Sequence, residues 1–406
     1  METESAIICE PSRYFDWAAA AIPNEEILKS ALDESLKTFA NPSSQHSAGK
    51  AARTALENAR EECARVLGIK ASRVFFTSGG TESSQIMLLS LLNKPEKGRI
   101  VLSAIEHPAI SAQADAMKKL GFDVVKVNPD KNGFVNPDSI AEKINGETLL
   151  VALTAVNNET GCIQDIYETA SKVEQVSAGK RKPLFHVDCV QAAGKIPLNL
   201  GFSGIDSAAL SAHKISGPRG IGILYSAKEI VPFLRGGGQE QNVRSGTENL
   251  FGAIAFAKAL RKYFIADTRA PENESANQAR FEAQKKTTAR FLESLLTIKN
   301  CRLVPKIREN LSAEVQSRFS PWIIQAAFTG IPGAVMVRAL DEKGFCVSTG
   351  SACSSKKQSR PILEAMRESK EIQDSAVRFS FGTLTTEESV NSLFLAVKSV
   401  CERFCD

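Results

Sequence analysis

The chain has 406 residues, more than one compact core usually contains, so its length favours two or three domains. Its 43% hydrophobic and 24% charged residues are typical of a globular protein and exclude the disordered and fibrous classes. The 50 basic and 46 acidic residues are interspersed, which argues against nucleic-acid binding. Without a basic and apolar leader or a run of about 18 apolar residues, we expect a cytoplasmic protein that does not enter the membrane.

A long helix is the first element that we predict, over residues 47–67. Apolar residues recur there at helical spacing, and Gly68 can cap the end. Up to about residue 226, short β-rich runs then alternate with helical stretches. Such alternation predicts an α/β fold with a mainly parallel sheet and helices on both faces. The β-rich runs are RVFFTS, RIVLSA, DVVKVN, TLLVALTAV, PLFHVD and GIGILYS.

A polar stretch over about 265–287 indicates a connection between domains or a frayed helix start. We therefore expect a large domain over residues 15–264 and a smaller α+β domain formed by residues 1–14 and 265–406. The elements predicted for the smaller domain are the strand WIIQAAF, the helix AVMVRALDEKG, the strand AVRFSF and a last helix opened by a capping box of Thr385 and Glu388.

The glycine-rich turn in FFTSGGTESSQIM follows an apolar strand and precedes a helix. Gly79 and Gly80 allow backbone N–H groups to approach an anion, Thr81 supplies a hydroxyl, and a helix N-terminus favours negative charge. The turn therefore indicates a phosphate site, although such a turn can also simply join a strand to a helix. The patterns GxxxxGK[ST] and GxGxxG are absent, which argues against nucleoside triphosphates and dinucleotides.

Two charged residues follow at strand ends. Asp188 ends the buried run PLFHVD, and ligands bind at the carboxyl ends of strands in open α/β sheets. A buried carboxylate there needs a partner, and a protonated pyridine nitrogen is one such partner. An N-cap or a buried ion pair is the alternative for Asp188. Lys214 ends the run SAALSAHK, where desolvation lowers the pKa of an amine and suits it to Schiff-base formation, whereas most lysines are solvated surface residues.

Nine cysteines are scattered along the chain without a CxxC pair, so we expect mostly reduced, buried thiols and neither a disulfide framework nor a zinc ribbon. The four histidines lack metal-ligand spacing, and we assign no metal. Cys353 differs from the other cysteines because it lies among small and hydroxylated residues and is followed by Lys356, Lys357 and Arg360. Nearby cations raise the thiolate fraction, so Cys353 is the candidate reactive thiol.

Taken together, these residues resemble the pyridoxal-phosphate-dependent cysteine desulfurases of the NifS/IscS type, within the class V aminotransferase group. The resemblance runs from FDWAAAAIP to RFSFGTLTTEE. Between them the family's motifs appear in its order: TSGGTES, EHPAI, VNNETG, HVDCVQAAGK, SAHKISGPRGIG, GGGQEQNVRSGTEN and STGSACSS. One departure is that alanines stand where the family usually has threonines, in residues 18–21.

The resemblance implies the fold of type I pyridoxal-phosphate enzymes, a seven-stranded type of sheet and a homodimer. It implies that Lys214 forms the internal aldimine, that Cys353 carries a persulfide, and that Arg378 binds the carboxylate of L-cysteine. The residues implied to hold the cofactor are His107 on the ring face, Asp188 at the pyridinium nitrogen, Asn158 and Gln191 at the ring's polar edge, and Gly80, Thr81, Ser211, His213 and the second subunit's Thr247 at the phosphate.

The implied reaction converts L-cysteine to L-alanine and passes sulfur to an acceptor protein of iron–sulfur cluster assembly or tRNA thiolation. One alternative keeps the cofactor and gives another class V aminotransferase or a selenocysteine lyase. A second alternative is a non-catalytic partner that binds a sulfur acceptor. The joint presence of Lys214, Asp188, His107, Cys353 and Arg378 argues against that second alternative.

Overall fold

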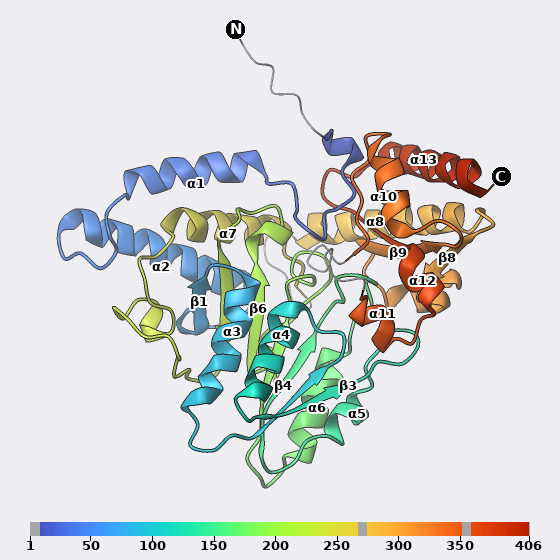
Figure 1. The fold of residues 1–406 in the computed structure, drawn as a ribbon. Coiled ribbons are helices and arrows are strands. Elements are labelled where there is room, and N and C mark those ends of the chain that lie inside the picture. Colours follow the sequence, from blue (N-terminus) through green and yellow to red (C-terminus); the bar gives the residue numbers. More distant parts are fainter. Residues whose placement is uncertain (1–8, 267–273, 351–358, 406) are drawn as a thin grey trace.

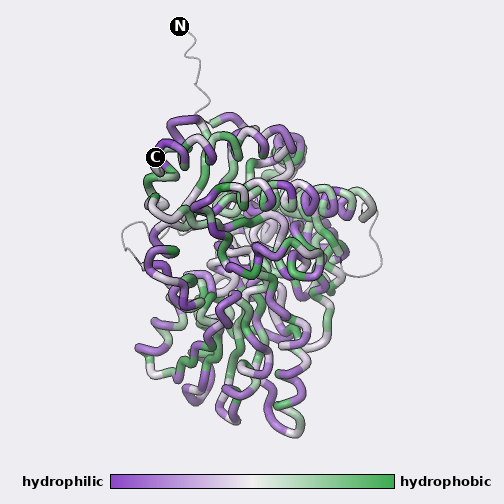
Figure 2. The backbone as a smooth tube through the Cα atoms, turned by 90° about the vertical axis from the view of Figure 1, so that its right-hand side faces the viewer, coloured by the Kyte–Doolittle hydropathy of each residue, from purple (hydrophilic) through white to green (hydrophobic). Residues whose placement is uncertain are grey.

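The structure is a computed structural model, and it describes residues 9–266, 274–350 and 359–405. Helices surround a seven-stranded sheet in one part of the molecule, and a smaller three-stranded sheet lies beside it (Figure 1). Figure 2 shows hydrophobic segments running through the interior and hydrophilic stretches toward the outer turns. No helix within the described ranges is both long and apolar enough to cross a membrane.

The seven strands lie in the order β1-β7-β6-β5-β4-β2-β3. Neighbouring strands are parallel from β3 to β6, whereas β7 is antiparallel to both β6 and β1. The predicted mainly parallel sheet is therefore confirmed. The strand bounds are β1 (Val74–Thr77), β2 (Arg99–Ser103), β3 (Asp123–Val127), β4 (Thr148–Thr154), β5 (Leu184–Asp188), β6 (Ser207–Ser211) and β7 (Gly222–Ser226).

The helices of this part include the long helix that the sequence predicts. It is α2 (Ser47–Leu67), and Gly68 ends it in the left-handed conformation, with a φ of 68°. α2 and α1 both pack on α7, so these three helices form one layer (Figure 1). The remaining bounds are α1 (Glu25–Lys37), α3 (Gly80–Ser90), α4 (Pro108–Lys119), α5 (Pro137–Ala141), α6 (Ile166–Val176) and α7 (Leu250–Tyr263).

The smaller sheet is antiparallel, in the order β10-β9-β8. Its strands are β8 (Cys301–Val304), β9 (Ile323–Phe328) and β10 (Ala376–Ser380). Its helices are α8 (Glu274–Leu295), α9 (Ala313–Ser317), α10 (Gly333–Asp341), α11 (Pro361–Ala365), α12 (Lys370–Ser375) and α13 (Glu387–Cys405). Short 3-10 turns occur at Pro11–Arg13, Ala71–Arg73, Leu91–Asn93, Ala212–Lys214, Glu240–Asn242 and Lys306–Glu309.

Two local predictions need correction. The polar stretch is mostly the long helix α8, and its buried face carries hydrogen-bonded polar side chains such as Gln284 and Thr288, so the apolar period of a helix is weak. The capping box of α13 consists of Thr386 and Ser389, each accepting from the other's backbone N–H. Thr385 instead accepts from the N–H of Gly382, so the box lies one residue later than expected.

The cysteines mostly agree with the expectation of reduced thiols. Cys63, Cys162 and Cys189 are free and buried, Cys401 is buried, and Cys301 is free and half-buried. The exception is a disulfide between Cys9 and Cys346, which are 337 residues apart. Sequence spacing gives no signal for this pair, because the segment after Cys9 pairs with the segment around Cys346 only in the folded chain.

Candidate active site

Lys214 ends the 3-10 turn that follows β6, and residues 18–21 of the N-terminal segment contact this turn. Its Nζ donates to the carbonyl oxygens of Ala18 and Ala19, each at 2.7 Å. The N–H of Ala21 donates to the carbonyl of His213 at 2.8 Å, which holds the segment in place. The stretch where alanines replace the expected threonines thus contacts Lys214 through its backbone.

Asp188 and His107 lie close enough to Lys214 to influence one another's charge. Burial raises the pKa of Asp188, whereas His107 and Lys214 lower it. Burial and Lys214 lower the pKa of His107, against the opposite effect of Asp188. His107 caps α4, and its Nδ1 accepts from the N–H of Ala109 at 3.1 Å. The site therefore combines a neutral imidazole ring with a buried carboxyl group that a cationic ligand would stabilise.

The glycine-rich turn places the N-terminus of α3 against β6. Gly79 caps α3 without any side chain, so the first backbone N–H groups are not covered by a cap. A Cβ on Gly80 would clash with Val190 and would lie 3.9 Å from Cβ of Ser211. The Ser211 hydroxyl is hydrogen-bonded to Nδ1 of His213 at 2.8 Å, and Thr81 is exposed in the first turn of α3. The residues predicted for the phosphate thus gather at one helix N-terminus, where an anion is favoured.

Gln191 and Asn158 are connected to other site residues through backbone carbonyls. The Nε2 of Gln191 donates to the carbonyl of Ala18 at 2.8 Å, and Ala18 also accepts from Lys214. Asn158 is half-buried, and its backbone carbonyl accepts from Nη1 of Arg378 at 2.9 Å. The carbonyl of Ala18 therefore connects Gln191 to Lys214, and the carbonyl of Asn158 connects this region to Arg378.

Arg378 lies in β10 and is 2% exposed. Its Nη1 also donates to the carbonyl of Gly350 at 3.2 Å, and its Nη2 pairs with Asp16 at 2.7 Å. Its Nε is buried and has no hydrogen-bond partner among the described residues. The planar guanidinium can donate two parallel N–H bonds to a carboxylate, so Arg378 is suited in type to hold a carboxylate ligand.

One of the predicted residues, Thr247, is not part of this cluster. Thr247 is exposed and lines a separate depression beside Thr38, Phe39 and Asn41. Cys353, together with Lys356 and Lys357, lies outside the described residues.

Arg360 does not act as the free cation that the sequence indicates. Its Nη2 donates to Glu159 at 3.1 Å and to the carbonyl of Thr349 at 2.6 Å, and its Nη1 donates to two further carbonyls. The residue is 8% exposed. Its charge is therefore compensated by Glu159, and we correct the expectation that Arg360 contributes to activating the Cys353 thiol.

The described cysteines include several thiols that burial keeps protonated. Burial raises the pKa of Cys162 to about 12 and raises the pKa of Cys63, Cys189 and Cys301 as well. Such thiols have a negligible thiolate fraction near neutral pH and are poor nucleophiles. This finding weakens four alternatives to Cys353. No cluster of three or more His, Cys, Asp or Glu side chains suited to a metal ion occurs in the described part of the chain.

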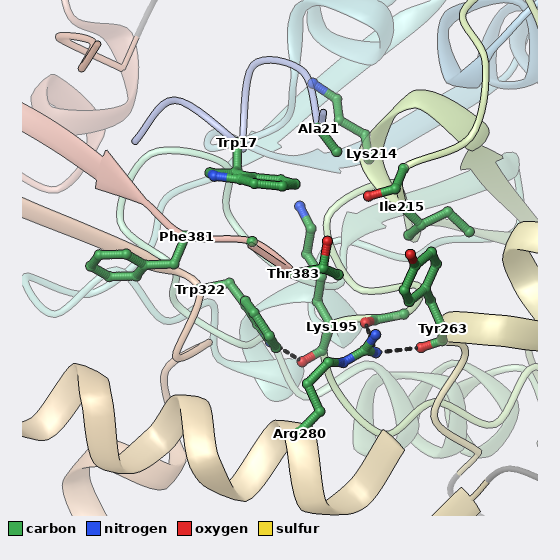
Figure 3. A pocket seen from close by; sticks show the side chains of 13 residues that line it. Trp17, Ala21, Lys195, Lys214, Ile215, Tyr263, Arg280, Trp322, Phe381 and Thr383 are labelled. Atoms are coloured by element: carbon green, nitrogen blue, oxygen red, sulfur yellow. Dashed lines mark hydrogen bonds between the residues drawn. The ribbon is translucent and has the colours of Figure 1, made fainter. Parts of the chain in front are cut away.

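Two further residues of the site were missed by sequence reasoning. Burial and then Asp188 raise the pKa of Glu106 to about 8, and its Oε2 has no hydrogen-bond partner in the described structure. Lys195 is 7% exposed and lines a small pocket with Lys214, Trp17 and Trp322 (Figure 3). The sequence offered one signal for each residue. Glu106 directly precedes His107, and Lys195 ends the mostly apolar segment CVQAAGK that follows Asp188.

Comparisons with known proteins place this site in a family. The class V aminotransferase family matches residues 13–393. A relative from Lactobacillus delbrueckii subsp. bulgaricus, named NifS/IcsS protein homolog, is 35% identical, and the match covers 96% of this chain and 97% of the relative. A relative from Dictyoglomus turgidum, named cysteine desulfurase IscS, is 32% identical, with coverages of 96% and 94%.

A solved structure agrees with these matches. The structure of a NifS-like protein aligns with a TM-score of 0.83 and 28% identity, and the alignment covers 96% of this chain and 99% of that chain. The chain therefore belongs to the class V aminotransferase family and, within it, to the NifS/IscS-type cysteine desulfurases.

Proposed function

We propose that the protein is a pyridoxal-phosphate-dependent cysteine desulfurase, which converts L-cysteine to L-alanine and retains the sulfur on Cys353. The observation that carries the proposal is the proximity of Lys214, Asp188 and His107 to one another, together with the approach of Val190 and Ser211 to Gly80 at the N-terminus of α3. Each fits one part of the cofactor: an amine for the aldehyde, a carboxylate for the pyridinium, and a neutral ring for the aromatic face. Members of the family depend on pyridoxal phosphate, which agrees with this fit.

The phosphate of the cofactor would bind at the first turn of α3, with Gly80 and Thr81, and beside Ser211 and His213. Burial and the nearby Lys214 lower the pKa of His213 to about 4, so its ring is neutral near pH 7 and acts through hydrogen bonds. Gln191 and Asn158 would serve the polar edge of the ring. We also propose that residues 15–264 form the cofactor-binding domain and that residues 1–14 and 265–406 form the smaller one.

In the proposed reaction, Arg378 holds the carboxylate of L-cysteine, and bound pyridoxal phosphate supplies an electron sink for negative charge on the substrate. The Cys353 thiolate attacks the substrate sulfur. A new S–S bond forms while the bond between the substrate's Cβ and sulfur breaks, and the electron pair stays with the carbon, which takes up a proton to become alanine. Lys214 is placed to move that proton because its amine lies in the site.

The persulfide on Cys353 must lose its outer sulfur before the next cycle. The proposal therefore includes an acceptor protein, which we place in iron–sulfur cluster assembly or tRNA thiolation.

The function is tested by incubating the purified protein with pyridoxal phosphate, L-cysteine and a thiol reductant. We expect alanine and sulfide in equal amounts, because the reductant removes the persulfide sulfur once per turnover. Release of a keto acid that requires an amino-group acceptor would instead indicate an aminotransferase. Turnover of selenocysteine without turnover of cysteine would indicate a selenocysteine lyase.

We further propose that two chains form a homodimer in which Thr247 reaches the partner's phosphate site. Thr247 is exposed and lies beside Phe39, which is 82% exposed, while Leu32 and Leu36 of α1 are 47% and 64% exposed. A cluster of exposed apolar side chains marks an interaction surface, and two-fold dimers are the commonest assemblies. A second copy would cover this surface and bring Thr247 to a phosphate site.

The shared site is tested by co-expressing Lys214→Ala and Thr247→Glu subunits that carry different tags. Each variant alone should be inactive, because one lacks the lysine and the other places a carboxylate at the phosphate. Half of the dimers are mixed and each mixed dimer has one intact site of two, so we expect about a quarter of normal activity. If Thr247 served its own chain, mixing would restore no activity. A fully active monomer in sedimentation would likewise contradict the shared site.

A further inference from the structure

Lys195 is a buried lysine to which the proposed reaction gives no role. Burial, Lys214 and Arg378 all lower its pKa well below the usual value. Buried lysines normally pair with carboxylates, because an unpaired buried charge is costly. Among the described residues no carboxylate pairs with Lys195, so stabilisation by an ion pair does not explain the residue. The charged and titratable groups around it are Lys214, Arg378, Arg280 and Tyr263.

The partner of Lys195 is instead an amide. Its Nζ donates to Oε1 of Gln191 at 2.5 Å, and Nε2 of the same amide donates to the carbonyl of Ala18 at 2.8 Å. Ala18 also accepts from Lys214 at 2.7 Å. The side chains of Lys195 and Gln191 and the carbonyl of Ala18 thus form a chain of hydrogen bonds that ends at Lys214.

This arrangement allows one orientation of the Gln191 amide. A carbonyl cannot donate, so Nε2 must face Ala18, and the ammonium and neutral forms of Lys195 both donate toward Oε1. The nitrogen has a second hydrogen, which remains to donate to a ligand. Lys195 itself is held in place, because its carbonyl accepts from Nε1 of Trp322 at 2.6 Å and its side chain extends toward Trp17 (Figure 3).

We propose that Lys195 is a positioning residue that fixes the Gln191 amide with its nitrogen, and not its oxygen, toward the ring oxygen of bound pyridoxal phosphate. The inference rests on the proposed function, since it needs the cofactor on Lys214 and Gln191 at the polar edge of the ring. A donor at the ring oxygen stabilises the deprotonated form of the bound cofactor. Loss of Lys195 leaves Oε1 without its donor, so the amide is held through its bond to Ala18 alone and its nitrogen is positioned less firmly toward that oxygen, which weakens the donor.

The test is a pH titration of the near-visible absorbance in the holoenzyme. We expect Lys195→Met to raise the titration midpoint by about one pH unit, a tenfold change in the proton equilibrium. Gln191→Ala should raise it by a similar amount. In the double variant the titration midpoint should shift no further than in Gln191→Ala alone, because Lys195 acts through Gln191. If Lys195→Met does not fold, Lys195→Gln is the second variant, since its side chain is one bond shorter and falls short of Gln191.

Two results would overturn the inference. One is an unchanged midpoint in a folded Lys195 variant, which would leave Lys195 a purely structural role. The other is an additive shift in the double variant, which would mean that Lys195 acts as an independent charge. A wild-type protein that forms no cofactor link at Lys214, or no alanine, would contradict the proposed function instead, so the two failures are distinguishable.

Discussion

Lys214→Ala is expected to abolish the covalent link between the protein and pyridoxal phosphate and to lower alanine production by at least about 10²- to 10⁴-fold, the usual contribution of a proton-transferring side chain. The physical reason is the position of Lys214 in the site. Its Nζ donates to the carbonyls of Ala18 and Ala19, and its charge affects the pKa of Asp188 and of His107. The measurement is the near-visible absorbance of the purified variant, followed by borohydride reduction and peptide mapping.

The matched control for this variant is Lys195→Met. Lys195 lies in the same pocket, and it is the lysine that would be modified if the cofactor attached elsewhere in the site. The control should keep the covalent link, so borohydride should still attach the cofactor to Lys214, even though the pH titration of its near-visible band is shifted. A band that persists in Lys214→Ala, with reduced cofactor mapped to another lysine, would refute the assignment of Lys214.

Cys353→Ala is expected to abolish alanine formation while leaving cofactor binding and the spectral response to L-cysteine intact. Lys214, Asp188 and Arg378 are unchanged in this variant, so binding is separated from the sulfur step. Neutralising Lys356 and Lys357 should slow the enzyme without stopping it. A drop of one unit in a thiol pKa, the change such cations can supply, raises the thiolate fraction at pH 7 several-fold.

Cys301→Ala provides the matched cysteine control. Cys301 is free and half-buried, and burial raises the pKa of its thiol, so it should contribute no nucleophile. The control should keep the rate of alanine formation. Loss of activity in Cys301→Ala, with normal activity in Cys353→Ala, would reverse the assignment.

The sequence was sufficient where local pattern determines structure. The apolar period and Gly68 define α2, and the β-rich runs define strands whose ends carry Asp188 and Lys214. Because the carboxyl ends of parallel strands meet at one edge of a sheet, residues far apart in sequence were predicted to share a site. The stretch that contains α8 was predicted only as a domain connection or a frayed helix start, since the buried face of α8 includes the polar residues Gln284 and Thr288.

The contacts that depend on tertiary placement could not be predicted. The carbonyls that bind Lys214 belong to Ala18 and Ala19, almost 200 residues away, and no side-chain pattern marks a carbonyl as an acceptor. Lys195 resembles any lysine at the end of an apolar run until its contact with Gln191 is known. Arg360 is similar, because its position after Cys353 indicates a free cation and only the fold pairs it with Glu159.

The central claim is that Cys353 receives the sulfur of L-cysteine in a site organised around Lys214. Mass spectrometry of the wild-type protein after a single turnover with L-cysteine, without reductant, tests this claim most directly. We predict one additional sulfur atom on the peptide that contains Cys353, and one alanine released for each sulfur retained. Sulfur found on another cysteine, with Cys353 unmodified and Cys353→Ala still producing alanine at the normal rate, would contradict the account.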